Sequence, residues 1–594
     1  MVTREINKYN FGVIGNCSYL GYIDTKANVN WLCLPRFDSS FLFGSLLDLE
    51  KGGEFSISPA TGDYKSKQYY IKNTNILATE FEMAEGRFRV VDFAPRFYQY
   101  ERYFKPLMLF RKIELLEGNP FISVVCRPVG DYGSMIPETV GGSNHIRFLN
   151  FNTQVRLTTD IPLGYILSKK SFVLTETKYA VFSYGVPLEA PLAETTESFL
   201  TKTKKYWSDW VKATSVPNIY QDEVIRSALV LKLHQYEDTG AVIASGTTSL
   251  PEFNGSQRTW DYRYCWMRDT YYTLNAFNNI GHFEELESYF QFIQNIIMNE
   301  KQQIKPLYTI LGDRVPNEKI LLLDGYQHNK PVRTGNNAIN QVQNDVYGQI
   351  LISLLPLFID KRLNYIDLKK TEFITEWLLD RIEEYMDVPD SGLWEFGTTN
   401  QFHCYTYLFH WAGCRAATKI GRFIDSDSLI RKAESLTKQS ILFIEKCYSP
   451  TKLAYTQAVG SEHLDASNLQ LILMSYLNPG SDIAMSHLKA HEKELFRDDN
   501  LFFRYTRDDL GKAETSFLIC GFWYAETLAA TGRLDKAQEI IEKLLKCSNH
   551  LGLFSEDADE NFGQWGNFPQ TYSHVGLVNA IYKLSMKIDK PIFL

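Results

Sequence analysis

Two glutamates stand in settings where a carboxyl group could do acid–base chemistry. Glu395 lies in the stretch DSGLWEFG, between Trp394 and Phe396, and Glu556 lies in LFSEDADENFGQWGNFPQ, a loop rich in Gly, Asn and aromatic residues. Hydrolysis of a glycosidic bond needs two such groups, one that protonates the leaving oxygen and one that activates water or attacks carbon. Aromatic neighbours favour the protonated form of a carboxyl group, so we expect Glu395 to be the general acid. In its polar loop, Glu556 is expected to stay ionised as the general base.

A third stretch, from Arg258 to Phe277, carries the densest set of groups suited to binding a sugar. Its Arg268 and Asp269 are adjacent and precede an apolar helical pattern. One interpretation is a buried ion pair that also caps the helix. The other is a set of donors and acceptors for neighbouring sugar hydroxyls, since each hydroxyl both donates and accepts. Three aromatic side chains could cover the apolar face of the ring: Trp260, Tyr262 and Trp266.

The elements that must position these residues change in type near residue 210. The first third holds short segments such as EFSIS, LATEFEM and FISVVCRP, rich in β-branched and aromatic residues, which predict an antiparallel β-sandwich. Farther along, apolar residues recur at three- and four-residue spacing in twelve segments, which predict helices. The predicted helices span about 220–237, 265–280, 282–299, 343–358, 371–386, 402–420, 426–447, 464–476, 481–493, 514–531, 534–547 and 573–588.

Twelve helices fit six hairpins closed into an (α/α)6 barrel. A stacked helical solenoid would also fit that number, but it would need a sequence repeat, and none is found. The predicted organisation is therefore a β-sandwich over 1–200, a helical linker over 201–222 and a catalytic (α/α)6 barrel over 223–594.

Composition bounds the possible functions. The chain has 594 residues, more than one hydrophobic core normally supports, with 44% hydrophobic and 22% charged residues. Its net charge is -8 and no stripe of Lys and Arg occurs, so we expect no nucleic-acid partner. No apolar run is long enough to span a membrane, and the first residues lack the apolar core of a signal peptide. A cytoplasmic protein with no membrane partner is expected.

The cysteines and the acidic cluster near the C-terminus lack the spacing of metal ligands. The nine cysteines are scattered, which is typical of free thiols in a reducing compartment. The acidic residues at 556–560 lack the spacing of a calcium loop. We therefore expect neither a metal nor a cofactor. The sequence leaves the choice between monomer and homo-oligomer open.

Taken together, these stretches resemble the glucoamylase family of inverting glycoside hydrolases, family fifteen. That family holds glucoamylases, glucodextranases and some microbial trehalases. The motifs follow in the family's order: WDYRYCWMRD, PVRTGNNAINQVQNDVYG, DSGLWEFG, LDASNL, GKAETSFLICGFW, GRLDKA and GLFSEDAD…GNFPQTYSHVGLVNA. The segment IGNCSYLGYIDTKANVNWLCLPRFDSSFLFGSLLD looks like the N-terminal signature of the prokaryotic branch.

The resemblance implies an N-terminal β-sandwich, a helical linker and a C-terminal (α/α)6 barrel. It places the general acid on Glu395 and the general base on Glu556, with a water between the base and the anomeric carbon. It also implies that Arg268 and Asp269 hold the non-reducing glucose in the innermost subsite. Aromatic residues would line that subsite: Tyr262, Trp266 and Trp394.

The activity implied by the resemblance is exo-acting and inverting, releasing β-glucose from the non-reducing ends of α-1,4-linked maltooligosaccharides. A trehalase and an α-1,6-glucan exo-hydrolase stay open, because the same carboxylates and glucose site serve all three and only the outer subsite differs. The N-terminal loop departs from the family pattern at residues 17–19, which can alter that outer subsite.

Two more distant alternatives are a disaccharide phosphorylase and a degenerate sugar-binding sensor. The phosphorylase would lack the catalytic base, and the sensor would be expected to lose one carboxylate. Glu395 and Glu556 are both present. The sequence therefore favours a glycoside hydrolase that acts on a small oligosaccharide or disaccharide of α-linked glucose.

Overall fold

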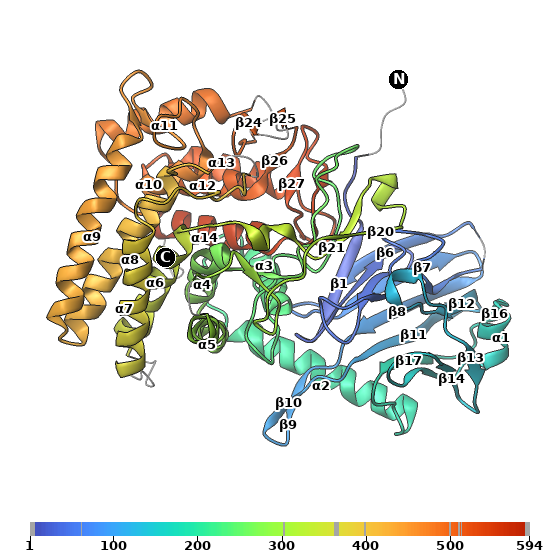
Figure 1. Cartoon of the computed structure of the whole chain (residues 1–594). Helices are drawn as coiled ribbons and strands as arrows, with labels where there is room; N and C mark the ends of the chain where they lie inside the picture. Colours follow the sequence, from blue (N-terminus) through green and yellow to red (C-terminus); the bar gives the residue numbers. More distant parts are fainter. Residues whose placement is uncertain are drawn as a thin grey trace.

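The computed structural model describes residues 6–60, 62–300, 303–361, 368–396, 400–497, 501–508, 511–512 and 514–588. A β-rich part and a helical part lie side by side and are joined by the long helix α2 (Leu192–Lys212), as Figure 1 shows. This arrangement confirms the predicted fold class, an antiparallel β-sandwich followed by an (α/α)6 barrel. Within the described residues, none of the helices is both long and apolar enough to span a membrane.

The N-terminal part is a sandwich of antiparallel sheets. Its largest sheet has eight strands, in the order β13 (Thr139–Gly141), β14 (His145–Phe148), β15 (Val155–Thr159), β17 (Lys178–Tyr184), β11 (Met108–Gly118), β8 (Gly86–Phe93), β7 (Leu77–Met83) and β6 (Lys65–Tyr70). A second sheet has the order β1 (Phe11–Gly15), β2 (Leu20–Asp24), β3 (Val29–Cys33) and β4 (Phe41–Phe43). A third has the order β16 (Phe172–Val173), β12 (Phe121–Arg127) and β5 (Glu54–Pro59).

One apolar core holds these three sheets together. The ring of Phe182 on β17 lies 5.2 Å from that of Phe43 on β4 and 6.2 Å from that of Phe55 on β5, measured between ring centroids. In β5 every second residue is buried, as expected for a strand with one face on a core. The N-terminal part also contains four smaller elements: β9 (Phe97–Gln99), β10 (Arg102–Phe104), η1 (Asp131–Gly133) and α1 (Leu163–Leu167).

Each of the twelve predicted helical segments contains an α-helix. They are α3 (Gln221–His234), α4 (Thr270–Ile280), α5 (Phe283–Asn299), α6 (Asp345–Ile359), α7 (Leu368–Glu384), α8 (Cys404–Phe423), α9 (Asp427–Lys446), α10 (Gln470–Leu473), α11 (Asp482–Leu495), α12 (Leu518–Ala530), α13 (Leu534–Leu545) and α14 (Thr571–Ile588). The shortest, α10, continues from the 3-10 helix η5 (Ala466–Leu469). The segment predicted at 265–280 is helical only from Met267, because the chain before it is the short strand β18 (Cys265–Trp266) and the next three residues form the 3-10 helix η2 (Met267–Asp269).

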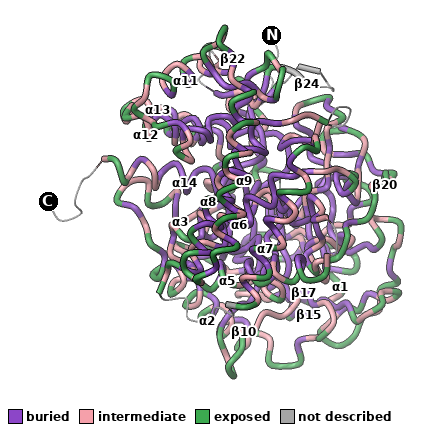
Figure 2. The backbone as a smooth tube through the Cα atoms, turned by 60° about the vertical axis from the view of Figure 1, so that its left-hand side comes forward, coloured by how far each residue is buried: buried purple, intermediate pink, exposed green. Residues whose placement is uncertain are grey.

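The even-numbered helices from α4 to α14 form a closed inner ring, since each packs against the next and α14 packs against α4. The odd-numbered helices from α3 to α13 lie outside them. Burial follows this order: α12 is buried on most faces, whereas the outer helix α13 buries one stripe at three- and four-residue spacing. That stripe consists of Ala537, Ile540, Ile541 and Leu544. Figure 2 shows buried residues, in purple, running through the middle of the molecule.

Because inner and outer helices alternate, the chain enters every inner helix from the same end of the barrel. The loops before these helices therefore meet there, and they contain short antiparallel strand pairs. The pairs are β18 with β19 (Leu307–Tyr308), β20 (Lys319–Leu321) with β21 (Val332–Thr334), β22 (Tyr448–Ser449) with β23 (Ala454–Tyr455), and β24 (Arg507–Asp508) with β25 (Gly511–Lys512). The first of these pairs joins two different loops, and the other three are hairpins within one loop. A three-stranded sheet joins β26 (Ser516–Phe517), β27 (Asp557–Ala558) and β28 (Gln564–Trp565).

The sandwich supports these loops from one side. Trp31 donates its indole N–H to the Gly246 carbonyl at 2.8 Å, and Arg263 donates to the Ser39 carbonyl at 2.8 Å. The linking helix α2 begins at Leu192, earlier than the predicted start of the linker at residue 201. The division into 1–200, 201–222 and 223–594 remains our proposal.

Candidate active site

A cavity of about 440 Å³ lies where the loops before the inner helices meet. All seven side chains to which the family resemblance gives a role line it: Tyr262, Trp266, Arg268, Asp269, Trp394, Glu395 and Glu556. They belong to the segments that precede α4, α8 and α14, so the barrel brings together residues far apart in the chain. One contact shows this directly, because the Tyr262 hydroxyl donates to Glu556 Oε1 at 2.8 Å across 294 positions.

Glu395 sits on a turn that holds its backbone in an unusual conformation. Its φ is +61°, in the left-handed region that residues other than glycine seldom adopt. Its N–H donates to the Gly392 carbonyl at 3.2 Å. The carboxylate Oε1 accepts from Trp266 Nε1 at 2.7 Å and from Arg268 Nη1 at 3.0 Å. Residues remote from the cavity, such as Lys169 and Leu453, also have a positive φ, so it is the contacts of the Glu395 carboxylate that indicate its role.

Arg268 and Asp269 form the floor of the cavity at the N-terminal end of α4. Arg268 Nε and Asp269 Oδ1 lie 3.7 Å apart, and both atoms are buried without a hydrogen-bond partner among the described residues. Asp269 makes no side-chain cap to α4, so the pair is not a helix cap. Burial raises the pKa of Asp269 to about 6, although the charge of Arg268 opposes the rise. A buried donor and a buried acceptor left open in this way can be satisfied by sugar hydroxyls.

Glu556 is buried in the loop before α14, with 1% of its surface exposed. Burial, followed by the charges of Asp557 and Glu252, raises its pKa well above the ordinary value of 4.5. Arg504 and the Tyr262 hydroxyl oppose this rise. Burial also raises the pKa of Asp557, to about 7. Glu556 Oε2 is buried and accepts no hydrogen bond from the described residues, which leaves one acceptor open beside the cavity.

The surroundings of the two glutamates are the reverse of those predicted. Glu395 is 25% exposed and is held by a cation and an indole N–H, where the sequence predicts apolar neighbours. Glu556 is buried and its pKa is raised, where the sequence predicts a polar loop that keeps it ionised. The cause is tertiary: Trp266 and Arg268 reach Glu395 from the segment before α4, and the glycine-rich loop before α14 is folded into the protein.

Trp394 is fixed by a carboxylate from another loop. Its Nε1 donates to both oxygens of Asp465, at 2.9 and 2.8 Å, and the Asp465 side chain also accepts from the Ser467 N–H at the start of η5. Burial raises the pKa of Asp465 to about 6. The indole ring also packs against Phe517, with ring centroids 5.9 Å apart. Both the polar and the apolar part of the indole are therefore held in place by neighbouring loops.

The cavity also contains charged residues that the sequence patterns did not indicate. Two carboxylate–arginine pairs line it: Glu252 Oε2 accepts from Arg504 Nη2 at 2.6 Å, and Glu318 Oε1 accepts from Arg333 Nε at 2.7 Å. Glu252, Glu318 and Arg333 lie in long loops rich in Gly, Asn and Pro, and that setting is the one signal the sequence offers for them. Arg504 lies in FFRYT, which carries no such signal.

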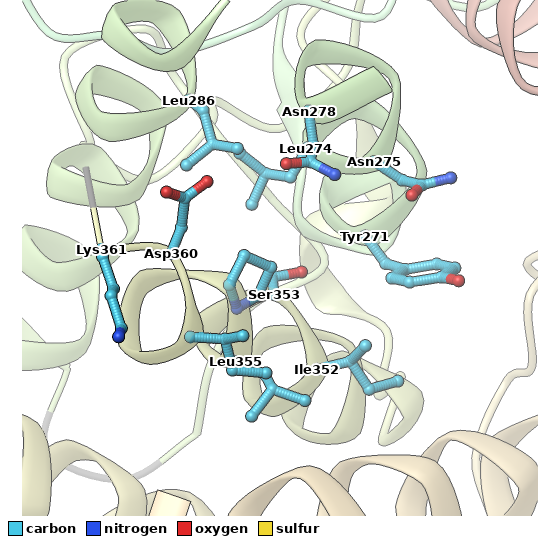
Figure 3. Close-up of a pocket in the computed structure, with 12 residues that line it drawn as sticks. Tyr271, Leu274, Asn275, Asn278, Leu286, Ile352, Ser353, Leu355, Asp360 and Lys361 are labelled. Carbon is cyan, nitrogen blue, oxygen red and sulfur yellow. The ribbon is translucent and has the colours of Figure 1, made fainter. Parts of the chain in front are cut away.

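A second cavity, of about 570 Å³, lies toward the other end of α4 and α6 and is shown in Figure 3. Its lining is mostly apolar, with Leu274 from α4, Leu286 from α5 and Ile352 from α6. Asp360 is the one carboxylate among the described residues that line it. A single carboxylate cannot supply the two roles that glycosidic hydrolysis requires, so we place the chemistry in the first cavity.

His487 and His491 are one turn apart on α11, the spacing of paired metal ligands on a helix. Both ring nitrogens of His487 are engaged, because Nδ1 accepts from the Tyr455 N–H at 3.1 Å and Nε2 lies 3.0 Å from the Asn468 carbonyl. Over the described ranges, no group of three or more His, Cys, Asp or Glu side chains is placed to hold a metal ion. The histidine pair is therefore part of the core.

Two family descriptions match the chain. "Trehalase-like, N-terminal" matches residues 5–135. "Glycosyl hydrolases family 15" matches residues 218–582, more than half of the chain, and this range contains all seven residues described above. The chain belongs to glycosyl hydrolases family 15. It is therefore a glycoside hydrolase, and the cavity at the loop end of its barrel is the candidate active site of a family 15 enzyme.

Named relatives of this family 15 hydrolase align along nearly all of its length. It is 33% identical to "Trehalase" of Thermoplasma volcanium, over 98% of this chain and 94% of that protein. Its identity to "Trehalase" of Mycobacterium tuberculosis is 28%, over 94% of this chain and 87% of that protein. The crystal structure of a bacterial glucoamylase complexed with acarbose superimposes with a TM-score of 0.68 at 14% identity, covering 98% of this chain and 95% of that one. That likeness extends the agreement to the fold of the whole chain.

Proposed function

We propose that this family 15 hydrolase is an α,α-trehalase, which splits trehalose into two molecules of glucose. The observation that carries the proposal is the shared cavity, in which Glu395 and Glu556 line the same space as Arg268 and Asp269. The relatives named trehalase support trehalose over the α-1,4-linked maltooligosaccharides that the motifs alone favoured. At about 440 Å³, the cavity lies near the lower end of the range for small-molecule pockets, which suits a disaccharide.

In the proposed inverting reaction, Glu395 is the general acid and Glu556 the general base. Arg268 and Asp269 hold the hydroxyls of one glucose at the floor of the cavity. Glu395 gives its proton to the glycosidic oxygen as the bond between that oxygen and C1 breaks. Glu556 takes a proton from a water, whose oxygen bonds to C1 from the opposite face. The products are one β-glucose and one α-glucose.

The surroundings of each glutamate support its proposed role. Trp266 and Arg268 donate to Glu395 Oε1, so they stabilise the carboxylate that remains once the proton has gone to the leaving oxygen. The raised pKa of Glu556 makes its carboxylate a stronger proton acceptor. Its open Oε2 offers an acceptor for the attacking water. Aromatic walls of the glucose subsite are proposed at Tyr262, Trp266 and Trp394.

We also propose that the enzyme works in the cytoplasm. All nine cysteines are buried and free. Free thiols are the usual state in a reducing compartment, which supports this proposal.

Proton NMR of the purified enzyme with trehalose, maltose, maltotriose and isomaltose in separate tubes tests the proposal. The anomeric signals report which bond breaks and which anomer appears first. Trehalose should be cleaved fastest and give equal early amounts of α- and β-glucose. Faster cleavage of maltotriose with early β-glucose would replace trehalase by glucoamylase. Early formation of α-glucose alone would mean retention and would overturn the proposed mechanism. Added phosphate should yield no glucose 1-phosphate.

The acid limb of the pH–rate profile should move in opposite directions in two variants. The Asp557 charge raises the pKa of Glu556, so Asp557→Asn should let the base ionise at lower pH and move the acid limb of kcat/KM down by about 1 pH unit. The Tyr262 hydrogen bond lowers the same pKa, so Tyr262→Phe should move the limb up. Profiles of kcat/KM for trehalose from pH 4 to 9 check both signs. Shifts in the same direction would contradict the assignment of this limb to Glu556.

Gly566 should tolerate no side chain. Its φ is +73°, and a Cβ there would lie 2.6 Å from the Cβ and from Oε2 of Glu556. Gly566→Ala should therefore displace the base and lower kcat at least tenfold. Gly460→Ala is the matched control, because its φ is +74° but nothing lies within 4 Å of its Cβ position. Steady-state rates and thermal unfolding of both variants separate the clash from the backbone strain, and equal loss of activity in the two would refute the prediction.

A further inference from the structure

Glu252 has a buried carboxylate that contacts N–H groups of three side chains in the cavity wall. It is 4% exposed and lies in the loop before α4. Its Oε1 accepts from Trp260 Nε1 at 3.3 Å, and its Oε2 accepts from Arg504 Nη2 at 2.6 Å. Arg258 Nη1 lies 3.6 Å from the same Oε2. All four side chains line the cavity. One negative charge therefore holds two guanidinium groups and an indole in a fixed arrangement.

The backbone around Glu252 ties the same wall to neighbouring loops. The Thr515 hydroxyl donates to the Glu252 carbonyl at 3.0 Å, and the Gly566 N–H donates to the Pro251 carbonyl at 2.7 Å. These contacts join the loops before α4, α12 and α14. Arg504 lies in the same loop as Thr515, between α11 and α12, and its guanidinium lies over the Tyr505 ring, 5.1 Å from the centroid. The Glu252 carboxylate thus binds cationic side chains at the place where these loops contact one another.

This wall is distinct from the glucose-binding floor. Arg268 and Asp269 stand at the end of an inner helix, whereas Arg258, Trp260 and Arg504 belong to loops before α4 and α12. Each guanidinium group carries several N–H donors, which can bond the hydroxyl and ether oxygens of a second sugar ring. A glutamine in place of Glu252 could still accept a hydrogen bond, but it could not balance two cations in a buried site.

We propose that Glu252 is a positioning residue that fixes Arg258, Trp260 and Arg504 as the wall that receives the leaving sugar. This inference rests on the proposed function, because it takes the substrate to be a disaccharide whose first ring occupies the floor. Glu252 does not take part in proton transfer. Glu252 holds the N–H donors that contact the second sugar ring, and it thereby favours substrates that have such a ring.

A substrate without a second sugar separates this role from a general effect on catalysis. α-Glucosyl fluoride places one glucose on the floor and loses fluoride, so it makes no use of a wall for a leaving sugar. Glu252→Gln should lower kcat/KM for trehalose about 10- to 100-fold, chiefly by raising KM, and change kcat/KM for α-glucosyl fluoride less than about threefold. Glu252→Asp, which keeps the charge, should recover part of the loss. Each variant is measured at its own pH optimum, because the Glu252 charge also raises the pKa values of Glu556 and Asp557.

The matched control is Glu285→Gln, remote from the cavity. Glu285 is 5% exposed and likewise accepts from an indole, Trp210 Nε1 at 2.9 Å, and pairs with a cation, Lys232 Nζ at 3.0 Å. Glu285→Gln should lower thermal stability without changing the ratio of kcat/KM for trehalose to kcat/KM for α-glucosyl fluoride. Equal losses on both substrates in Glu252→Gln, or no loss on either, would overturn the inference. If the wild type cleaves α-glucosyl fluoride but not trehalose, the proposed function fails, and the same comparison with the disaccharide it does cleave still decides the role of Glu252.

Discussion

Replacing Glu395 by Gln is expected to lower kcat for trehalose about 10³-fold while leaving the hydrolysis of α-glucosyl fluoride within a few-fold of wild type. A glucose leaving group must be protonated as the bond breaks, whereas fluoride departs as a stable anion. The amide oxygen can still accept from Trp266 and Arg268, so the turn and the floor should keep their arrangement. Initial rates on the two substrates, measured on one preparation, give the result.

This pair of rates decides between the two assignments of the glutamates. Burial and a raised pKa, which here belong to Glu556, are also the properties of many general acids. If Glu556 were the acid, the Gln variant at that position would be the one that keeps fluoride hydrolysis, and Glu395→Gln would lose both activities. The variant that retains fluoride hydrolysis therefore marks the acid. The trehalose rate alone cannot make this distinction, because it falls in either case.

The local pattern of the chain was sufficient to predict the elements of the fold. Amphipathic helices such as α13 repeat their apolar residues with the period of the helix, and strands such as β5 alternate buried and partly exposed residues. Both kinds of element can therefore be predicted from residues that are close in the sequence. The number of helices fits six hairpins closed into a barrel, and the absence of a sequence repeat argues against a stacked solenoid. The ends of the elements were less predictable where the chain enters an inner helix, as at β18 and η2, because contacts with other loops set the conformation there.

Residue type and sequence motifs were sufficient to select side chains that the structure brings together. Arg268, Asp269, Glu395 and Glu556 all line one cavity. Their surroundings were not predictable, because neighbours in space decide them: Arg268 reaches Glu395 across 127 positions, and Arg504 reaches Glu252 across 252. The left-handed backbone of Glu395 was hidden for the same reason, since the tertiary structure imposes a conformation that the residue type disfavours.

Replacing Glu556 by Gln should abolish both activities, with losses of about 10³-fold or more on trehalose and on α-glucosyl fluoride. Both substrates need an attacking water, and both therefore need the base. The floor is left intact, so binding of glucose measured by calorimetry should change little. An enzyme that lost sugar binding together with turnover would point to damage of the cavity, and one that kept fluoride hydrolysis would show that Glu556 is not the base.

Glu556→Gln should also make the folded protein more stable than wild type, by an amount that grows as the pH rises. Burial raises the pKa of Glu556 in the folded state, so the folded protein holds this proton to higher pH than the unfolded chain does, and stability falls as pH rises above the unfolded value. Gln removes that dependence. The difference in Tm between Glu556→Gln and wild type should therefore grow between pH 5 and pH 8. Growth of this difference together with the loss of turnover would mean that burying the base costs the fold stability in exchange for a stronger proton acceptor. A difference that stays flat or shrinks would mean that Glu556 ionises in the folded enzyme as readily as in the unfolded chain, and the argument from its burial would fail.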